Sequence, residues 1–121
     1  MKFENGQFHS NEPIYLQIVE LIKKAIATGE LKADEKLPSV REMSQLLSVN
    51  PNTMQRAYGE LERQGMTETR RGLGSFVSSQ NHDVDTLKTE LAKTAMEKCL
   101  VELKTIGLSD EEIKALMEEL L

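Results

Sequence analysis

Two helix starts separated by a very short turn constrain the fold of this chain more than any other feature. Ser39 precedes a helical spacing of apolar residues and stands three residues before Glu42, which is the pattern of a capping box. After the turn, Asn50 is a good N-cap, and Pro51 suits the first helical position because its missing N–H has no partner there in any case. The sequence therefore predicts two adjacent helices that meet at a tight turn.

The second helix has an apolar stripe and a polar outer face. Met54, Ala57, Tyr58 and Leu61 share one side, and Gly65 stands where a left-handed C-cap belongs. The other side carries Asn52, Thr53, Gln55 and Arg56, with Gly59. Such side chains can bond to the base edges and phosphates of DNA, and the N-terminal half of a helix in the major groove does most of the reading. A DNA-binding helix-turn-helix is therefore predicted over about residues 39–58.

A basic, glycine-rich hairpin is predicted next, at about residues 67–78. Strand-forming threonines, Phe76 and Val77 flank the run Arg70-Arg71-Gly72-Leu73-Gly74, whose composition suits turn positions with positive φ. A cationic tip of this kind would lie along a phosphate backbone or enter a minor groove. An ordinary solvated turn is the alternative interpretation of the two arginines.

Four separated motifs of the chain resemble the GntR-family winged-helix domain, in the right order and with the right gaps. They are PIYLQI at residues 13–18, LPSVRE at 37–42, VNPNT at 49–53 and RGLGSFV at 71–77. The match runs from about residue 11 to 79. Pro51 stands where many members have an arginine, and the run Asn-Pro-Asn-Thr in that place is similar to the small YtrA-like subgroup.

The resemblance implies which residues contact DNA. It places these contacts at Arg41 in the first helix, at Asn50, Asn52, Thr53 and Gln55 around the start of the second, and at Arg70, Arg71 and Gly72 in the wing. We add Ser39, and also Arg56, whose alternative role is an ion pair with Glu60 on the helix surface.

The charge of the chain is divided unevenly along its length. The net charge is −5, but residues 1–79 hold ten Lys or Arg and ten Asp or Glu, whereas residues 80–121 hold five and ten. The acidity therefore belongs to the C-terminal third, and a locally basic face needs no basic protein. We predict an arm at 1–10, a winged helix-turn-helix domain at 11–79 that begins with an amphipathic helix after Pro13, and a further segment at 80–121.

Residues 80–121 predict two amphipathic helices, making the fold mainly α with a small β wing. Asp83 can cap the first, which ends at Gly107, and Ser109 and Glu112 form a second capping box. An antiparallel hairpin of these helices carries more apolar surface than it can bury internally, so we predict a two-fold dimer. The predicted interface comprises Leu87, Leu91, Met96, Leu100, Leu103, Ile113, Leu116 and Leu120.

Several classes of function are not supported by the residues. His9 and His82 are isolated from each other and from Cys99, so we predict no metal site, and we predict no cofactor. A Ser-His-Asp set, a P-loop and a dinucleotide fingerprint are all missing, so we predict that the chain is not an enzyme. With no apolar run of roughly 20 residues and no signal peptide, we expect a cytoplasmic protein.

The predicted function is sequence-specific binding of double-stranded DNA by a bacterial transcriptional regulator. We expect a dimeric repressor on a palindromic operator, and the resemblance implies a transporter or stress operon as its target. One alternative is a ligand-responsive sensor whose C-terminal helices hold a small molecule. Another is a winged-helix module that binds protein. About 40 residues after the wing are too few for a large effector domain, so we expect no dedicated pocket.

Overall fold

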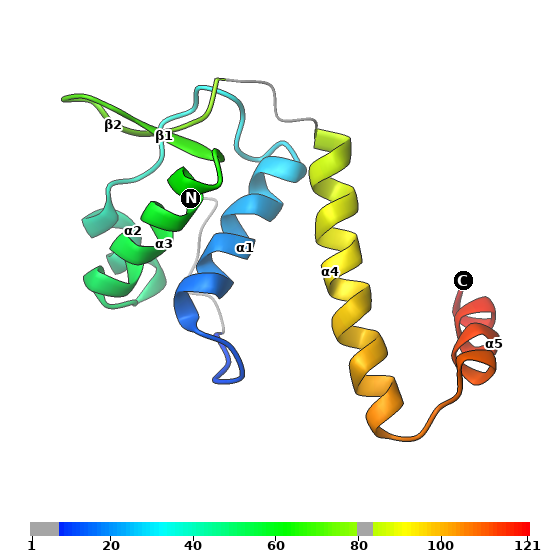
Figure 1. Ribbon diagram of the computed structural model, residues 1–121. Coiled ribbons are helices and arrows are strands. Elements are labelled where there is room, and N and C mark those ends of the chain that lie inside the picture. The colour runs from blue at the N-terminus through cyan, green and yellow to red at the C-terminus, as the bar shows by residue number, and fades with distance from the viewer. Residues whose placement is uncertain (1–7, 80–83) are drawn as a thin grey trace. The chain divides into compact units, whose positions relative to one another are not determined.

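The computed structural model describes residues 8–79 and 84–121. It contains helices and one small antiparallel sheet, as predicted from the sequence (Figure 1). The element order is α1 (Ile14–Ala27), α2 (Val40–Leu47), α3 (Pro51–Arg63), β1 (Thr67–Arg70), β2 (Gly74–Val77), α4 (Val84–Thr105) and α5 (Asp110–Leu120). The chain forms two compact units, the first ending at Leu87 and the second beginning at Lys88. The division falls inside α4, later than the predicted end of the winged domain at residue 79.

The core of the first unit lies between its three helices. Both α1 and α2 pack against α3. The apolar stripes predicted from the spacing are buried, and the fully covered side chains include Ile18, Ile22, Met43, Leu47, Met54 and Leu61. Because α3 contacts both other helices, its stripe holds the unit together and its opposite side is left on the surface.

The predicted caps form at both helix starts. The Ser39 N–H donates to Glu42 Oε1 at 3.0 Å, and the Glu42 N–H donates to Ser39 Oγ at 3.1 Å. At the start of α3, Asn50 Oδ1 accepts from the Asn52 N–H at 2.8 Å, and Pro51 takes the first helical position. Between the helices, Ser48 adopts a left-handed conformation with φ 54°. This conformation costs about 1 kcal/mol for a residue other than glycine, so the turn is held by the packing on either side of it.

A third segment, which the sequence analysis did not predict, is hydrogen-bonded to the two-stranded sheet. Strands β1 and β2 pair antiparallel, with Thr67 opposite Val77 and Arg70 opposite Gly74. Residues 34–37 run along the other edge of β2, where the Val77 N–H donates to the Glu35 carbonyl at 2.8 Å. Thr67 and Val77 at the base of the hairpin are buried and β1 contacts α3, while the turn projects outward (Figure 1).

Part of the predicted N-terminal arm is held against α1. The side chain of Gln17 donates to the carbonyls of His9 and Glu12 and accepts from the His9 N–H. Residues 8–12 are therefore fastened to the first turn of α1. The first seven residues of the predicted arm lie outside the described residues.

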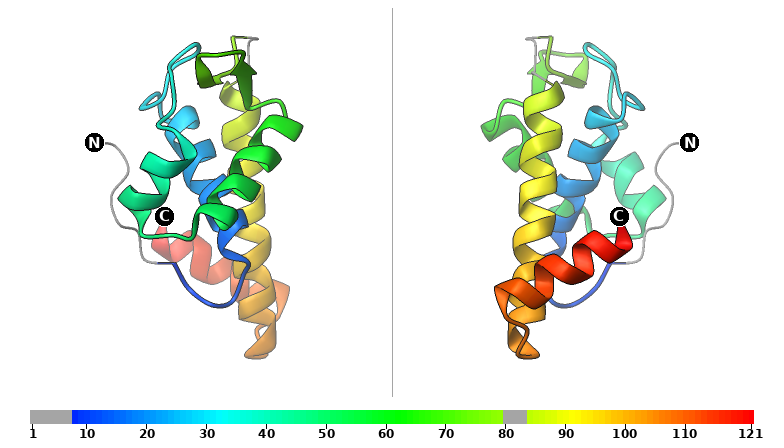
Figure 2. Two further views of the ribbon diagram at one scale, coloured as in Figure 1. Left: turned by 90° about the vertical axis from the view of Figure 1, so that its left-hand side faces the viewer. Right: turned by 90° about the vertical axis from the view of Figure 1, so that its right-hand side faces the viewer.

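The second unit consists of most of α4 and the shorter α5. Gly107 reverses the chain with φ 89°, and Ser109 and Glu112 form the predicted capping box of α5. The predicted cap Asp83 lies outside the described residues. After the turn, α5 diverges from α4 and does not pack along it, so the antiparallel hairpin predicted from the sequence is more compact than the observed pair (Figures 1 and 2). The apolar residues of α4 are spread around the helix rather than gathered on one stripe.

Two of the predicted dimer residues are already covered within the chain. Leu87 is 4% exposed and Ile113 is 6% exposed, so neither offers surface to a partner. Met96, Leu100, Leu116 and Leu120 are exposed, while Leu91 and Leu103 are half-buried. Ile106 and Val101 are exposed apolar residues that the prediction omitted. In the part of the chain that the structure describes, no helix combines the length and apolar character needed to cross a membrane.

Replacing Ser39 with alanine should lower the free energy of unfolding of the first unit by about 1 kcal/mol, because the Glu42 N–H loses its acceptor. Urea denaturation followed through NMR signals of residues 14–77 measures this loss. Ser109→Ala makes the same change in the other capping box and should leave those signals unaffected. If both variants shifted the urea midpoint of the first unit equally, the two capping boxes would not stabilise their units independently.

Candidate DNA interface

One side of the first unit presents three elements together. Figure 1 shows α2, the N-terminal end of α3 and the hairpin turn on the same side, and the left view of Figure 2 faces that side, with α1 behind them. These are the elements on which the sequence analysis places all ten predicted DNA contacts. The predicted contacts therefore come from elements that lie on one side of the first unit.

The outer side of α3 supplies neutral hydrogen-bonding groups. Asn52 and Gln55 are exposed and Thr53 is half-buried. Asn50 is also exposed, but its Oδ1 caps the helix by accepting from Asn52, which leaves its amide NH₂ group for an outside acceptor. Gly59 lies further along the same face, and nothing stands within 4 Å of the place where a Cβ would be. The surface is therefore polar, open and without bulky side chains near its middle.

A buried hydroxyl connects α3 to the start of α2. The Tyr58 hydroxyl donates to the Pro38 carbonyl at 2.5 Å, and burial raises the pKa of Tyr58, with the nearby Glu42 carboxylate adding to the rise. Tyr58 is 6% exposed, which confirms the interpretation of this residue as core. Because Pro38 immediately precedes Ser39, the bond helps to set the position of α2 relative to α3.

Arg56 stacks on an aromatic ring instead of forming the ion pair that was its alternative role. Its guanidinium lies over the Tyr15 ring, 4.0 Å from the ring centre. Glu60 instead pairs with Arg63 and accepts from the Gln64 amide, and these bonds lower its pKa to about 2. Among the residues that the structure describes, Arg56 therefore has no ion-pair partner, and it lies beside α1. The sequence analysis did not identify Tyr15, since a contact between helices leaves no local pattern.

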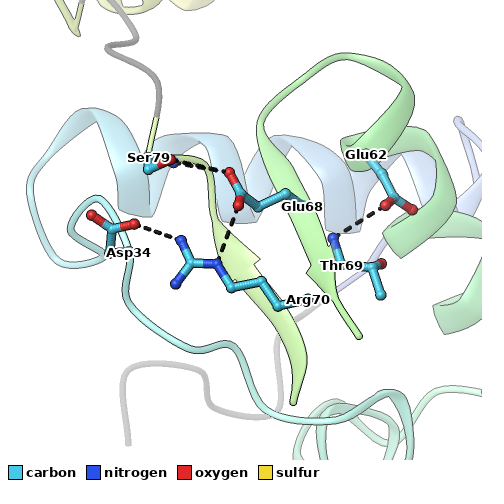
Figure 3. Close-up of polar contacts among 6 residues, drawn as sticks. All are labelled: Asp34, Glu62, Glu68, Thr69, Arg70 and Ser79. Carbon is cyan, nitrogen blue, oxygen red and sulfur yellow. Dashed lines mark hydrogen bonds and ion pairs between the residues drawn. The ribbon is translucent and has the colours of Figure 1, made fainter. Parts of the chain in front are cut away.

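Arg70, which the sequence analysis predicted as a phosphate contact, is engaged by two carboxylates within the protein. Its Nη2 lies 2.5 Å from Asp34 Oδ1 and its Nε lies 3.1 Å from Glu68 Oε2 (Figure 3). The same guanidinium covers the Phe76 ring, 4.3 Å from its centre. Two carboxylates thus compensate one charge, and Arg70 joins β1 to the segment before α2. The Asp34 contact spans 36 residues, so sequence spacing could not reveal it.

The acidic residues near the wing are also held by partners. Glu68 accepts from the Ser79 N–H at 3.1 Å, and its pKa is lowered first by this bond and then by Arg70. Glu62 accepts from the Thr69 N–H at 3.2 Å, which joins α3 to β1 (Figure 3). These carboxylates stabilise the base of the wing. They are two of the ten acidic residues that balance the ten Lys and Arg of residues 1–79.

Arg41 and Arg71 remain the uncompensated cations among the predicted wing and α2 contacts. Both are exposed, and neither forms an ion pair with any residue that the structure describes. Gly72 has φ 76°, the left-handed conformation that lets the chain reverse immediately after Arg71. The turn therefore presents Arg71 at the tip, while Arg70 lies at the end of the paired strand.

A metal centre does not form in the described part of the chain. No group of three or more His, Cys, Asp or Glu side chains among those residues is placed to hold an ion. Cys99 is half-buried on α4, whereas His9 lies in the segment before α1. The chemistry of this surface is hydrogen bonding and charge.

Comparison with known proteins gives a consistent result. Residues 14–77 match the family described as bacterial regulatory proteins, gntR family. The chain is 46% identical over 109 residues to the HTH-type transcriptional regulator YhcF of Bacillus subtilis, and the match covers 90% of each protein. It is 40% identical over 97 residues to the HTH-type transcriptional repressor YtrA of the same organism, covering 80% of this chain and 70% of that one.

Solved structures agree in fold. A GntR family transcriptional regulator from Listeria monocytogenes superposes with a TM-score of 0.76 at 38% identity, covering 93% of this chain and 98% of that chain. AraR(DBD) in complex with operator ORX1 has a TM-score of 0.56 at 31% identity, and it covers 60% of this chain and 93% of that one. The second comparison includes bound DNA.

Proposed function

The chain belongs to the GntR family of bacterial regulatory proteins, and on this premise we propose that it is a dimeric repressor that binds a palindromic DNA operator. The observation that carries the proposal is the open polar side of α3, flanked by the uncompensated Arg41 and Arg71 on one face of the first unit. A family of regulatory proteins also agrees with the prediction that the chain is not an enzyme.

In this proposal, base reading and phosphate binding belong to different residues. Asn52 and Gln55 have the amide groups that can bond bidentately to adenine, and Thr53 can contact a phosphate or a thymine methyl group. Arg41, Arg56 and Arg71 would bind phosphates and set the register of the helix in the groove. Three predicted contacts remain, and they would bind DNA through a short polar side chain or a backbone group: Ser39, Asn50 and Gly72. Arg70 is left out because its charge is compensated.

The regulated genes are proposed from relatives alone. YtrA of B. subtilis is named as a repressor, and its match extends beyond the winged domain into the C-terminal unit. We therefore propose repression of a transporter or stress operon, as the YtrA-like resemblance implied. The protein-binding alternative is not favoured, because that function calls for apolar or aromatic groups, and α3 presents amides and arginine on its exposed face.

The C-terminal unit is proposed as the dimer contact. Ile106 is 71% exposed, Leu120 is 80% exposed, and Met96, Leu100 and Leu116 add to the apolar surface. A short pair of helices that leaves this much apolar surface uncovered is stabilised by association with a second copy. Two recognition helices would then reach half-sites spaced by about one turn of DNA, roughly 34 Å.

Changing Gln55 to alanine should relax base preference at one operator position by about 1–3 kcal/mol, because one bidentate amide contact is lost. Competition binding with operator duplexes that carry single base changes measures this effect. Gln64→Ala is the matched control, because it removes the same side chain at the opposite end of α3. If Gln55→Ala discriminated between bases as well as the native protein, α3 would not be reading through that residue.

Replacing Leu100 and Leu103 together with glutamate should convert the protein to monomers, because two charges would have to be buried in an apolar interface. Analytical ultracentrifugation over a range of concentrations gives the association state. Lys93→Glu adds acidic charge to the exposed surface of the same helix and should leave the native dimer intact. A double variant that still sedimented as a dimer would place the interface elsewhere.

A further inference from the structure

A second uncompensated cation lies beside the wing turn, on a segment to which the sequence analysis assigned no role. Lys36 belongs to residues 34–37, which form the outer edge of the sheet. Its side chain is exposed and forms no ion pair with any of the residues in 8–79 and 84–121. Lys36 is therefore available to an external anion in a way that Arg70 is not.

The pairing of the strands sets the face on which Lys36 lies. Lys36 stands opposite Phe76 across one edge of β2, and Glu68 stands opposite Phe76 across the other. Residues directly opposite one another in antiparallel strands place their side chains on the same face. Leu37, the neighbour of Lys36, points the other way and is buried. Lys36 thus lies on the solvent face of the sheet.

Gly74 leaves room for Lys36 to reach along the sheet toward the wing turn. A Cβ at Gly74 would lie 3.2 Å from Lys36 Cε and 3.9 Å from its Nζ. The missing side chain therefore lets the lysine stem lie directly over the backbone where β2 begins. Because Gly74 follows the turn that carries Arg71, the ammonium group is directed to the same end of the wing.

Lys36 also lies close enough to α2 to act on its first turn. The pKa of Glu42 is lowered mainly by its hydrogen bonds with Ser39, and the positive charge of Lys36 lowers it further. Glu42 is the chain neighbour of Arg41. The Lys36 side chain therefore contacts the start of β2 next to the turn that carries Arg71, and its charge acts on the first turn of α2, which carries Arg41.

We infer that Lys36 binds a DNA phosphate at this interface, and that the cationic pair of the wing is Lys36 with Arg71 rather than Arg70 with Arg71. The inference rests on the proposed DNA-binding function and adds a contact to it. Lys36 would bridge the phosphate contacts of α2 and the wing along one strand of the DNA backbone. A side chain at Gly74 would crowd the lysine stem, in addition to being disfavoured by the φ of 114° at this position.

The test compares Lys36→Met with Lys32→Met. Methionine keeps an unbranched stem of similar length over Gly74 and removes only the charge. Lys32 is an exposed lysine four residues earlier in the chain, outside residues 34–37. Fluorescence anisotropy with a duplex selected from genomic fragments measures affinity between 50 and 200 mM salt. The slope of log affinity against log salt should fall in magnitude by about 0.9 per protomer in Lys36→Met. The native protein should then lose about 3.5-fold more affinity per protomer than the variant over this range.

Arg71→Met and Lys36→Arg separate the possible outcomes. A reduced slope in Arg71→Met, together with a native slope in Lys36→Met, would overturn the assignment of Lys36 and leave the proposed function standing. Native slopes in both variants would remove the wing from DNA binding altogether. A loss of affinity by the same factor at every salt concentration would indicate a structural effect and also overturn the inference. Lys36→Arg should retain the native slope.

Discussion

The turn between α2 and α3 is the constraint on which the arrangement of this surface depends. Ser48 is held in a left-handed conformation, and Pro51 begins α3 only three residues later. The Tyr58 hydroxyl adds a second connection between the two helices by donating to the Pro38 carbonyl. With α3 fixed in this way, its apolar stripe faces α1 and α2. The amide side chains of Asn52 and Gln55, on the opposite side of α3, are therefore exposed to solvent and available to a ligand.

Charge at the interface is distributed by pairing rather than by composition. The residues up to 79 are neutral overall, but Glu60, Glu62 and Glu68 all accept hydrogen bonds from groups within the first unit. Arg70 forms ion pairs with Asp34 and Glu68, and these contacts stabilise the base of the wing. Arg41 and Arg71, which form no ion pair with any described residue, lie on α2 and the wing turn beside α3. A locally positive surface thus forms on a domain with no net charge.

Local features were predictable from the sequence and long-range ones were not. Ser39 with Glu42, and Asn50 with Pro51, act within one helical turn, so spacing alone indicated both helix starts. Arg70 and Arg71 are adjacent and identical in sequence, yet Asp34 engages only the first, and that contact could not be inferred from spacing. The bridge between residues 34–37 and β2 was missed for the same reason, because its partner lies far away in the sequence. In the C-terminal unit, helical spacing predicted the helices but not the divergence of α5 from α4.

The central claim is that the N-terminal half of α3 binds DNA, flanked by cations from α2 and the wing. Amide chemical-shift mapping of the labelled full-length protein with a selected operator duplex tests it most directly. The largest changes are expected at Asn52, Thr53 and Gln55, with smaller ones at Arg41 and Arg71. Changes concentrated in α5 or on the α1 side of the unit, with α3 unaffected, would contradict the account.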